Sequence, residues 1–112
     1  MNIVENIKIL QINLNRSIVA IESALNLAIE LQIGIIAVQE PWVFPRLDND
    51  YTITRSVIHQ NYTQVLPNHG SLHPRTLFYI AKSISQFVGI SENSPQDPDY
   101  TIIDIIIQDI KT

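Results

Sequence analysis

The strongest constraint on this fold is a pair of short apolar runs separated by a segment with helical periodicity. Residues 7–13 and 34–39 are rich in isoleucine and short enough to be buried strands. Between them, apolar residues recur at helical spacing through residues 17–32, with Ser17 placed to cap the start and Gly34 placed to stop the helix. A strand, a helix and a strand in this order form a βαβ unit, so we predict two neighbouring parallel strands.

The rest of the chain has weaker patterns. We predict strands at residues 75–82 and 100–110, because both are apolar and rich in β-branched residues. We also predict a strand at 51–58, a short partner for the 75–82 strand at 85–90, and loops at 59–74 and 91–99. The simplest organisation is one domain over residues 1–112, with a single sheet that holds the strands at 7–13, 34–39, 75–82 and 100–110.

Composition and charge exclude several classes of protein. Apolar residues make up 46% of the chain, which is enough for a core, and the net charge of −4 argues against a free-standing module for binding polyanions. The absence of cysteine excludes disulfides, zinc–thiolate sites and cysteine nucleophiles. Residues 1–12 lack the features of a signal peptide, and no apolar run reaches the roughly 18 residues of a membrane span, so we expect no membrane partner.

Polar residues follow both strands of the predicted βαβ unit. Asn13 ends the first strand, Asn15 comes two residues later, and Glu40 follows the second strand. Parallel neighbours end at the same edge of a sheet, where open α/β folds bind ligands, and amide and carboxylate oxygens suit Mg²⁺. The alternative is that Asn13 is a turn or capping residue and Glu40 is merely solvated. Spacing alone favours this simpler interpretation.

Three segments resemble a known superfamily. ILQINLNRS at residues 9–17 and IIAVQEPWV at 35–43 are similar to the endonuclease/exonuclease/phosphatase superfamily, above all to the endonuclease domain of non-LTR (LINE-type) retrotransposons. HPRTLFYIAK at 73–82 looks like a strand of related fungal elements. The resemblance implies an α/β fold in which two sheets form a β-sandwich flanked by helices. It also implies a Mg²⁺-dependent activity that nicks DNA.

The resemblance assigns roles to individual residues. Asn13 and Glu40 match the catalytic pair: Glu40 would ligate Mg²⁺, and Asn13 would help to place the metal and the attacked phosphate. Asn15 would lie near the metal and contact it through a water molecule. Gln39 would hold Glu40 in position without binding the metal itself. Arg16, and with less support Arg75, would contact DNA phosphates (Arg75 lies in the 73–82 segment).

Other groups of the family site have no match. In the family, a water-activating histidine–aspartate pair, an Asp-x-Asn pair and a tyrosine follow a strand that Thr101–Ile110 resembles, whereas this sequence ends at Thr112. We therefore expect the N-terminal portion of the sandwich only, weak Mg²⁺ binding and little activity from the chain alone. DNA is the expected partner of a complete domain, which would act inside the cell, in the nucleus.

Several residues that suggest chemistry have simpler interpretations. His59, His69 and His73 fall in a predicted loop and are better explained as surface residues than as catalytic groups. Trp42 and Phe44 could stack on DNA bases, but we favour packing at the rim of the sheet.

A non-catalytic alternative stays open. Part of a sandwich exposes an apolar face and an open sheet edge, both of which favour association. The chain could therefore be an interaction protein derived from a truncated retrotransposon, with self-association through the exposed edge.

Overall fold

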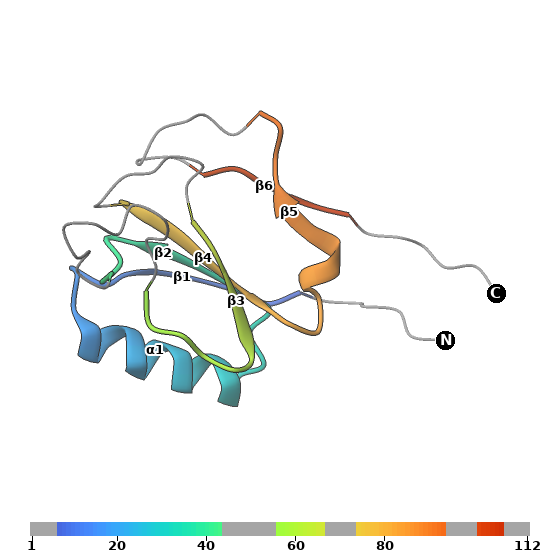
Figure 1. Cartoon of the computed structure of the whole chain (residues 1–112). Coiled ribbons are helices and arrows are strands. Elements are labelled where there is room, and N and C mark those ends of the chain that lie inside the picture. Colours follow the sequence, from blue (N-terminus) through green and yellow to red (C-terminus); the bar gives the residue numbers. More distant parts are fainter. Residues whose placement is uncertain (1–6, 44–55, 67–73, 94–100, 107–112) are drawn as a thin grey trace.

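The structure is a computed structural model that describes residues 7–43, 56–66, 74–93 and 101–106 (Figure 1). In these residues the structure is a mixed α/β fold with one α-helix, a short 3₁₀ helix and two small sheets. The elements are β1 (Ile9–Asn13), α1 (Ile18–Glu30), β2 (Ile35–Gln39), β3 (Tyr62–Val65), β4 (Thr76–Ala81), β5 (Val88–Ile90) and β6 (Ile103–Ile105). The larger sheet has the strand order β1-β2-β4-β3, and β5 and β6 form a separate pair.

The predicted βαβ unit is confirmed. Strands β1 and β2 are parallel neighbours, and their register runs from Ile9 opposite Ile35 to Asn13 opposite Gln39. Ser17 caps α1, since its hydroxyl accepts a hydrogen bond from the backbone N–H of Ala20 at 3.2 Å. The local sequence pattern was therefore sufficient to place these three elements.

The end of α1 differs from the prediction. Gly34 does not adopt a left-handed conformation; Gln32 does, with φ of 56°, and the N–H of Ile33 then bonds to the carbonyl of Ala28 at 2.8 Å. Gly34 is small for another reason: a Cβ there would lie 3.1 Å from Cγ2 of Ile7 and 3.2 Å from Cδ1 of Ile84. The glycine allows close packing instead of terminating the helix.

One face of the larger sheet packs against α1. Alternate residues of each strand point to the same face, so the even residues of β1 and β2 meet the helix. The core of this layer consists of Ile21, Ala24, Leu25 and Ala28 from α1 with Ile36, Val38, Leu77, Tyr79 and Tyr62 from the sheet. Leu31 lies within the segment predicted to be helical, at residues 17–32, but it is exposed and follows Glu30, the last residue of α1.

The opposite face is covered by the β5–β6 pair, as Figure 1 shows. Ile35 and Ile80 are buried here, with Val88, Ile103 and Ile105 packed against them. The prediction that residues 100–110 join the larger sheet is therefore wrong for the described part of that segment. The apolar, β-branched composition correctly predicted a strand here, since β6 lies within this segment, but composition does not specify the sheet to which a strand belongs.

The predicted partner strand at 85–90 is also corrected. Ser85–Phe87 form a 3₁₀ turn, and β5 pairs antiparallel with β6 instead of β4. Within the described residues, no strand was found at the predicted 51–58 position: residues 56–58 are not a strand, and residues 51–55 lie outside the described part.

The fourth place in the larger sheet belongs to β3, which falls in the predicted loop at 59–74. Tyr62 anchors it, because its hydroxyl donates to the carbonyl of Ile33 at 2.8 Å and its ring meets that of Tyr79 edge to face. The side chain of Gln64 bonds to the backbone of Ser56 and Val57, with three contacts of 2.9 Å. These partners are distant or side-chain-mediated, so local periodicity did not reveal the strand.

Tyr79 predicts an alkaline weakness of the fold. Its side chain is fully buried, its hydroxyl donates to the carbonyl of Val57 at 2.8 Å, and burial raises its pKa to about 12. In the unfolded chain the hydroxyl of Tyr79 ionises at a pH of about 10. The contribution of Tyr79 to the free energy of unfolding should therefore be complete below that pH and should fall between pH 10 and 12. The limiting slope is about 1.4 kcal/mol per pH unit.

Urea denaturation at a series of pH values would measure this slope. Tyr79→Phe should cost about 0.5–1.5 kcal/mol at neutral pH, because a buried hydrogen bond is lost, and should flatten the alkaline decline. Burial also raises the pKa of Tyr62. Tyr62→Phe is therefore the matched comparison, because it measures how much of the alkaline decline comes from Tyr62 and not from Tyr79. Equal alkaline slopes in the wild type and Tyr79→Phe would show that Tyr79 is not responsible.

Candidate functional site

The predicted site residues lie along one edge of the larger sheet. Asn13 and Gln39 are register partners at the carboxyl ends of β1 and β2, and Gln39 is also opposite Thr76 at the start of antiparallel β4. The backbone N–H of Glu40 donates to the carbonyl of Arg75 at 2.9 Å, which places Arg75 at the same edge. We call this region the carboxyl edge; it comprises residues 13–16, 39–40 and 75–76.

The turn after β1 uses the side chain of Asn13. Its Oδ1 accepts a hydrogen bond from the backbone N–H of Asn15 at 2.9 Å, as in an Asx turn. This is the local role that the simpler interpretation of Asn13 anticipated. Each amide oxygen has two lone pairs, so Oδ1 retains one further acceptor position.

The backbone of the carboxyl edge is held in an unfavourable conformation. Asn15, Arg16 and Glu40 have positive φ values of 47°, 59° and 50°, in the left-handed region. Asparagine tolerates this region, but for arginine and glutamate it costs roughly 1–2 kcal/mol each. Such strain persists only where neighbouring contacts fix the backbone.

Backbone hydrogen bonds of the carboxyl edge supply those contacts. The N–H of Leu14 donates to the carbonyl of Gln39 at 2.9 Å, and the N–H of Arg16 donates to the carbonyl of Glu40 at 2.8 Å. The N–H of Glu40 bonds to the carbonyl of Arg75 on its other side. Glu40 therefore connects the turn after β1 with the start of β4.

Arg16 and Glu40 also form an ion pair. Nη2 of Arg16 lies 3.0 Å from Oε2 of Glu40, and the two side chains are 42% and 34% exposed. An ion pair that is this accessible to water contributes about 0–1 kcal/mol to stability. Its main effect is to keep the only charged oxygen donor predicted for the site in contact with a cation.

The carboxyl edge is linked to the second sheet. Ile12 and Val38 pack on the helix side, so the next residues, Asn13 and Gln39, point toward the face that β5 and β6 partly cover. Oγ1 of Thr76 lies 3.1 Å from Oγ1 of Thr101, just before β6. No sequence signal marks these threonines, because threonine is ordinary in strands.

The donor set at the carboxyl edge fits a cation that keeps most of its water. Glu40 offers a half-buried carboxylate and Asn13 an exposed amide oxygen. Across residues 7–43, 56–66, 74–93 and 101–106, no group of three or more His, Cys, Asp or Glu side chains could hold a metal. Mg²⁺ binds through one or two carboxylates and several waters, so this pair suits Mg²⁺ weakly and does not suit a closed metal site.

His59 lies away from these residues. Its ring meets Tyr62 edge to face at 5.8 Å, and its Nδ1 accepts from the N–H of Asn61 at 3.0 Å. Tyr62 is the register partner of Ala81, at the opposite end of β4 from Thr76. The structure therefore gives His59 a local packing role, as the simpler interpretation expected.

Other sequence candidates contribute less to the site. Trp42 is half-buried shortly after Glu40. His69, His73 and Phe44 lie outside the described residues.

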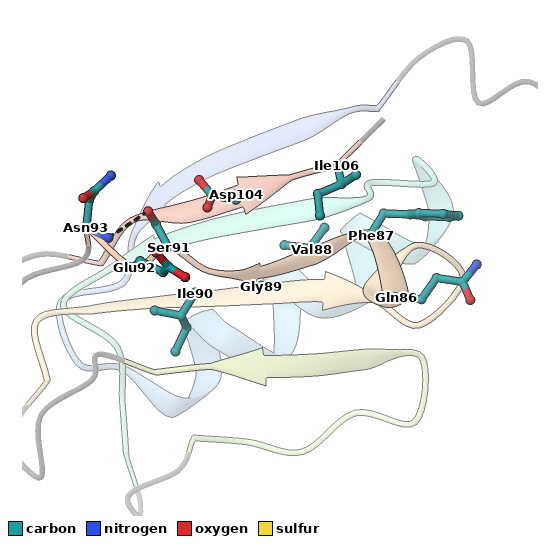
Figure 2. A pocket seen from close by; sticks show the side chains of 10 residues that line it. All are labelled: Gln86, Phe87, Val88, Gly89, Ile90, Ser91, Glu92, Asn93, Asp104 and Ile106. Carbon is teal, nitrogen blue, oxygen red and sulfur yellow. Dashed lines mark hydrogen bonds between the residues drawn. The ribbon is translucent and has the colours of Figure 1, made fainter. Parts of the chain in front are cut away.

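A separate hollow of about 410 Å³ lies on the β5–β6 pair (Figure 2). Gly89 stands opposite Asp104, and a Cβ at Gly89 would meet no atom within 4 Å. Figure 2 shows Ser91 and Asn93 toward one end and Phe87 toward the other. The hollow is open and shares no residue with the carboxyl edge.

Comparison with known proteins gives no match. No protein-family model matches the chain, and no curated protein or solved structure is significantly similar to it. Among the described residues, none of the helical segments has both the length and the apolar character needed to cross a bilayer.

The strain at Glu40 predicts an inverted order of stability for two variants. Glu40→Gly and Glu40→Ala both remove the carboxylate, but only glycine relieves the left-handed backbone. The glycine variant should be more stable than the alanine variant by about 1 kcal/mol in urea denaturation. Glu22, exposed in the middle of α1, is the control: there the alanine variant should be more stable by about 1 kcal/mol. Alanine being the better residue at both positions would contradict strain at Glu40.

Proposed function

We propose that the carboxyl edge is the metal- and phosphate-binding part of a Mg²⁺-dependent DNA endonuclease site of the LINE-retrotransposon type. The observation that carries the proposal is the convergence of Asn13, Arg16 and Glu40 at the ends of two adjacent parallel strands. Ligands of open α/β sheets bind at this edge. The layer order supports it too, since α1 and the β5–β6 pair lie on opposite faces of the larger sheet, as in a β-sandwich with helices outside.

Each residue of the carboxyl edge has a role in this proposal. Glu40 and Asn13 supply the oxygen donors in this proposal; Asn15, in the same turn as Asn13, acts through water, and Gln39 supports Glu40. A bound Mg²⁺ would neutralise charge that develops on the phosphate and on the leaving oxygen. Arg16 and Arg75 supply positive charge for the DNA backbone.

The described residues at this edge include no histidine that could act as a general base beside Glu40. His59 is at the other end of the sheet, next to Tyr62. Catalytic groups that act together lose most of their effect when one of them is missing. We therefore propose that this chain binds the cation weakly and has little or no nicking activity by itself.

The test is the binding of Mn²⁺, which serves as a paramagnetic substitute for Mg²⁺. The backbone amide NMR signals of Asn15 and Glu40 should broaden first. Glu40→Gln, which keeps the side-chain shape, should weaken binding at least about tenfold. Glu30→Gln is the control, because it removes the same charge from the exposed far end of α1 and should leave binding unchanged.

Two outcomes would contradict the proposal. Broadening that is centred away from the carboxyl edge, or that is unaffected by Glu40→Gln, would remove the basis for a metal site.

A parallel assay with supercoiled plasmid and Mg²⁺ should show no nicking. Nicking that disappears in Glu40→Ala would contradict the expected inactivity.

A second candidate function is non-catalytic association, which the outer edge of β1 favours. The carbonyl of Lys8 and the N–H of Leu14 bond toward β2, so the backbone groups of Ile9, Gln11 and Asn13 point the other way. Within the described residues, β1 is the end strand of its sheet, Ile9 is 61% exposed, and residues 9–13 carry no charge or proline to block pairing.

This candidate predicts an antiparallel dimer through two copies of β1 centred on Gln11. Sedimentation velocity should then show a shift from monomer to dimer with increasing concentration. Gln11→Lys should favour the monomer, because two like charges would face each other across the dimer axis. Gln32→Lys, in the turn after α1, is the matched control. A monomer at all concentrations would exclude this association.

A further inference from the structure

We infer that Arg16 is a built-in counter-ion of the carboxyl edge, whose guanidinium holds Glu40 in the free protein and has to leave before Glu40 can take a divalent cation. This inference rests on the proposed function and concerns the regulation of the same site. It follows from the way in which Arg16 and Glu40 are joined.

Two contacts connect Arg16 with Glu40. The backbone N–H of Arg16 donates to the carbonyl of Glu40 at 2.8 Å, and Nη2 of Arg16 lies 3.0 Å from Oε2 of Glu40. The backbone contact fixes the origins of both side chains. Forming the pair therefore orders only side-chain rotamers, because the backbone positions of both residues are already set when the turn forms. The pair should be more persistent than one between two independent surface residues.

The guanidinium and a divalent cation would compete for the same oxygen atoms. Glu40 is the one carboxylate of the carboxyl edge, and Asn13 adds only a neutral amide oxygen. Two cations that share one carboxylate repel each other, so Glu40 cannot keep Arg16 at close range and bind a divalent cation with full strength. The affinity of the free protein for a cation is lowered by the free energy of the pair.

This competition also couples the two proposed ligands. A phosphodiester that attracts the guanidinium of Arg16 leaves Glu40 available to a cation, and the coupling must be reciprocal. The carboxyl edge would therefore bind its cation more tightly when a phosphate backbone is present. Arg16, half-exposed at 42%, has access to solvent for this change of partner.

The experiment compares Mn²⁺ binding to the wild type, Arg16→Gln and Lys82→Gln, again through broadening of the Asn15 and Glu40 amide signals. Arg16→Gln should bind Mn²⁺ at least about threefold more tightly, because the competing charge is gone. Lys82→Gln removes an equal charge from an exposed side chain just after β4, at the opposite end of the sheet. It should match the wild type, which separates the local effect from a change of net charge.

Each outcome distinguishes the inference from the proposed function. Suppose that the wild type and Arg16→Gln bind Mn²⁺ with equal affinity and that Glu40→Gln does not bind it. That result would overturn the counter-ion role and would still support the metal site. No binding at the carboxyl edge in any variant would overturn the proposed function and this inference with it. If Arg16→Gln does not fold, Arg16→Lys serves in its place, since a more mobile ammonium should compete less well; an affinity at or below that of the wild type would contradict the inference.

Discussion

The parallel pairing of β1 with β2 is the interaction on which the rest of the structure depends. It fixes α1 against one face of the sheet and brings two strand ends together. The pairing does not stop at the strand ends, because Leu14 and Arg16 continue the backbone hydrogen bonds to Gln39 and Glu40. This continuation requires left-handed backbone at Arg16 and Glu40, so the stability of the ladder compensates for local strain.

The central strands β2 and β4 are buried on both faces, which explains their near-continuous apolar sequences. On one side, Ile36 and Tyr79 meet α1; on the other, Ile35 and Ile80 meet the β5–β6 pair. The end strands differ, since β1 is exposed on alternate residues and β3 depends on the anchored ring of Tyr62. The most deeply buried part of this sheet is therefore its centre. Glu40, which directly follows central strand β2, connects the carboxyl edge to that centre through its backbone hydrogen bonds.

The candidate site could be predicted as a location but not as a set of contacts. The order of strand, helix and strand was enough to place Asn13 and Glu40 at one edge, because parallel strands end together. The Arg16–Glu40 pair and the role of Arg75 as a backbone partner of Glu40 were not foreseeable. Both depend on turns in which non-glycine residues have positive φ, and no sequence pattern predicts such turns.

By itself, the sequence determined the elements whose information is local: the βαβ unit, the cap at Ser17 and the apolar segments that became β4 and β6. Only the tertiary structure decided how the later strands pair: β3 belongs to the larger sheet, and β6 pairs with β5 in the second sheet. The physical reason is that hydrophobic alternation specifies a buried face, whereas the choice of neighbour depends on long-range contacts. The bond between Tyr62 and Ile33, 29 residues apart, is one such contact.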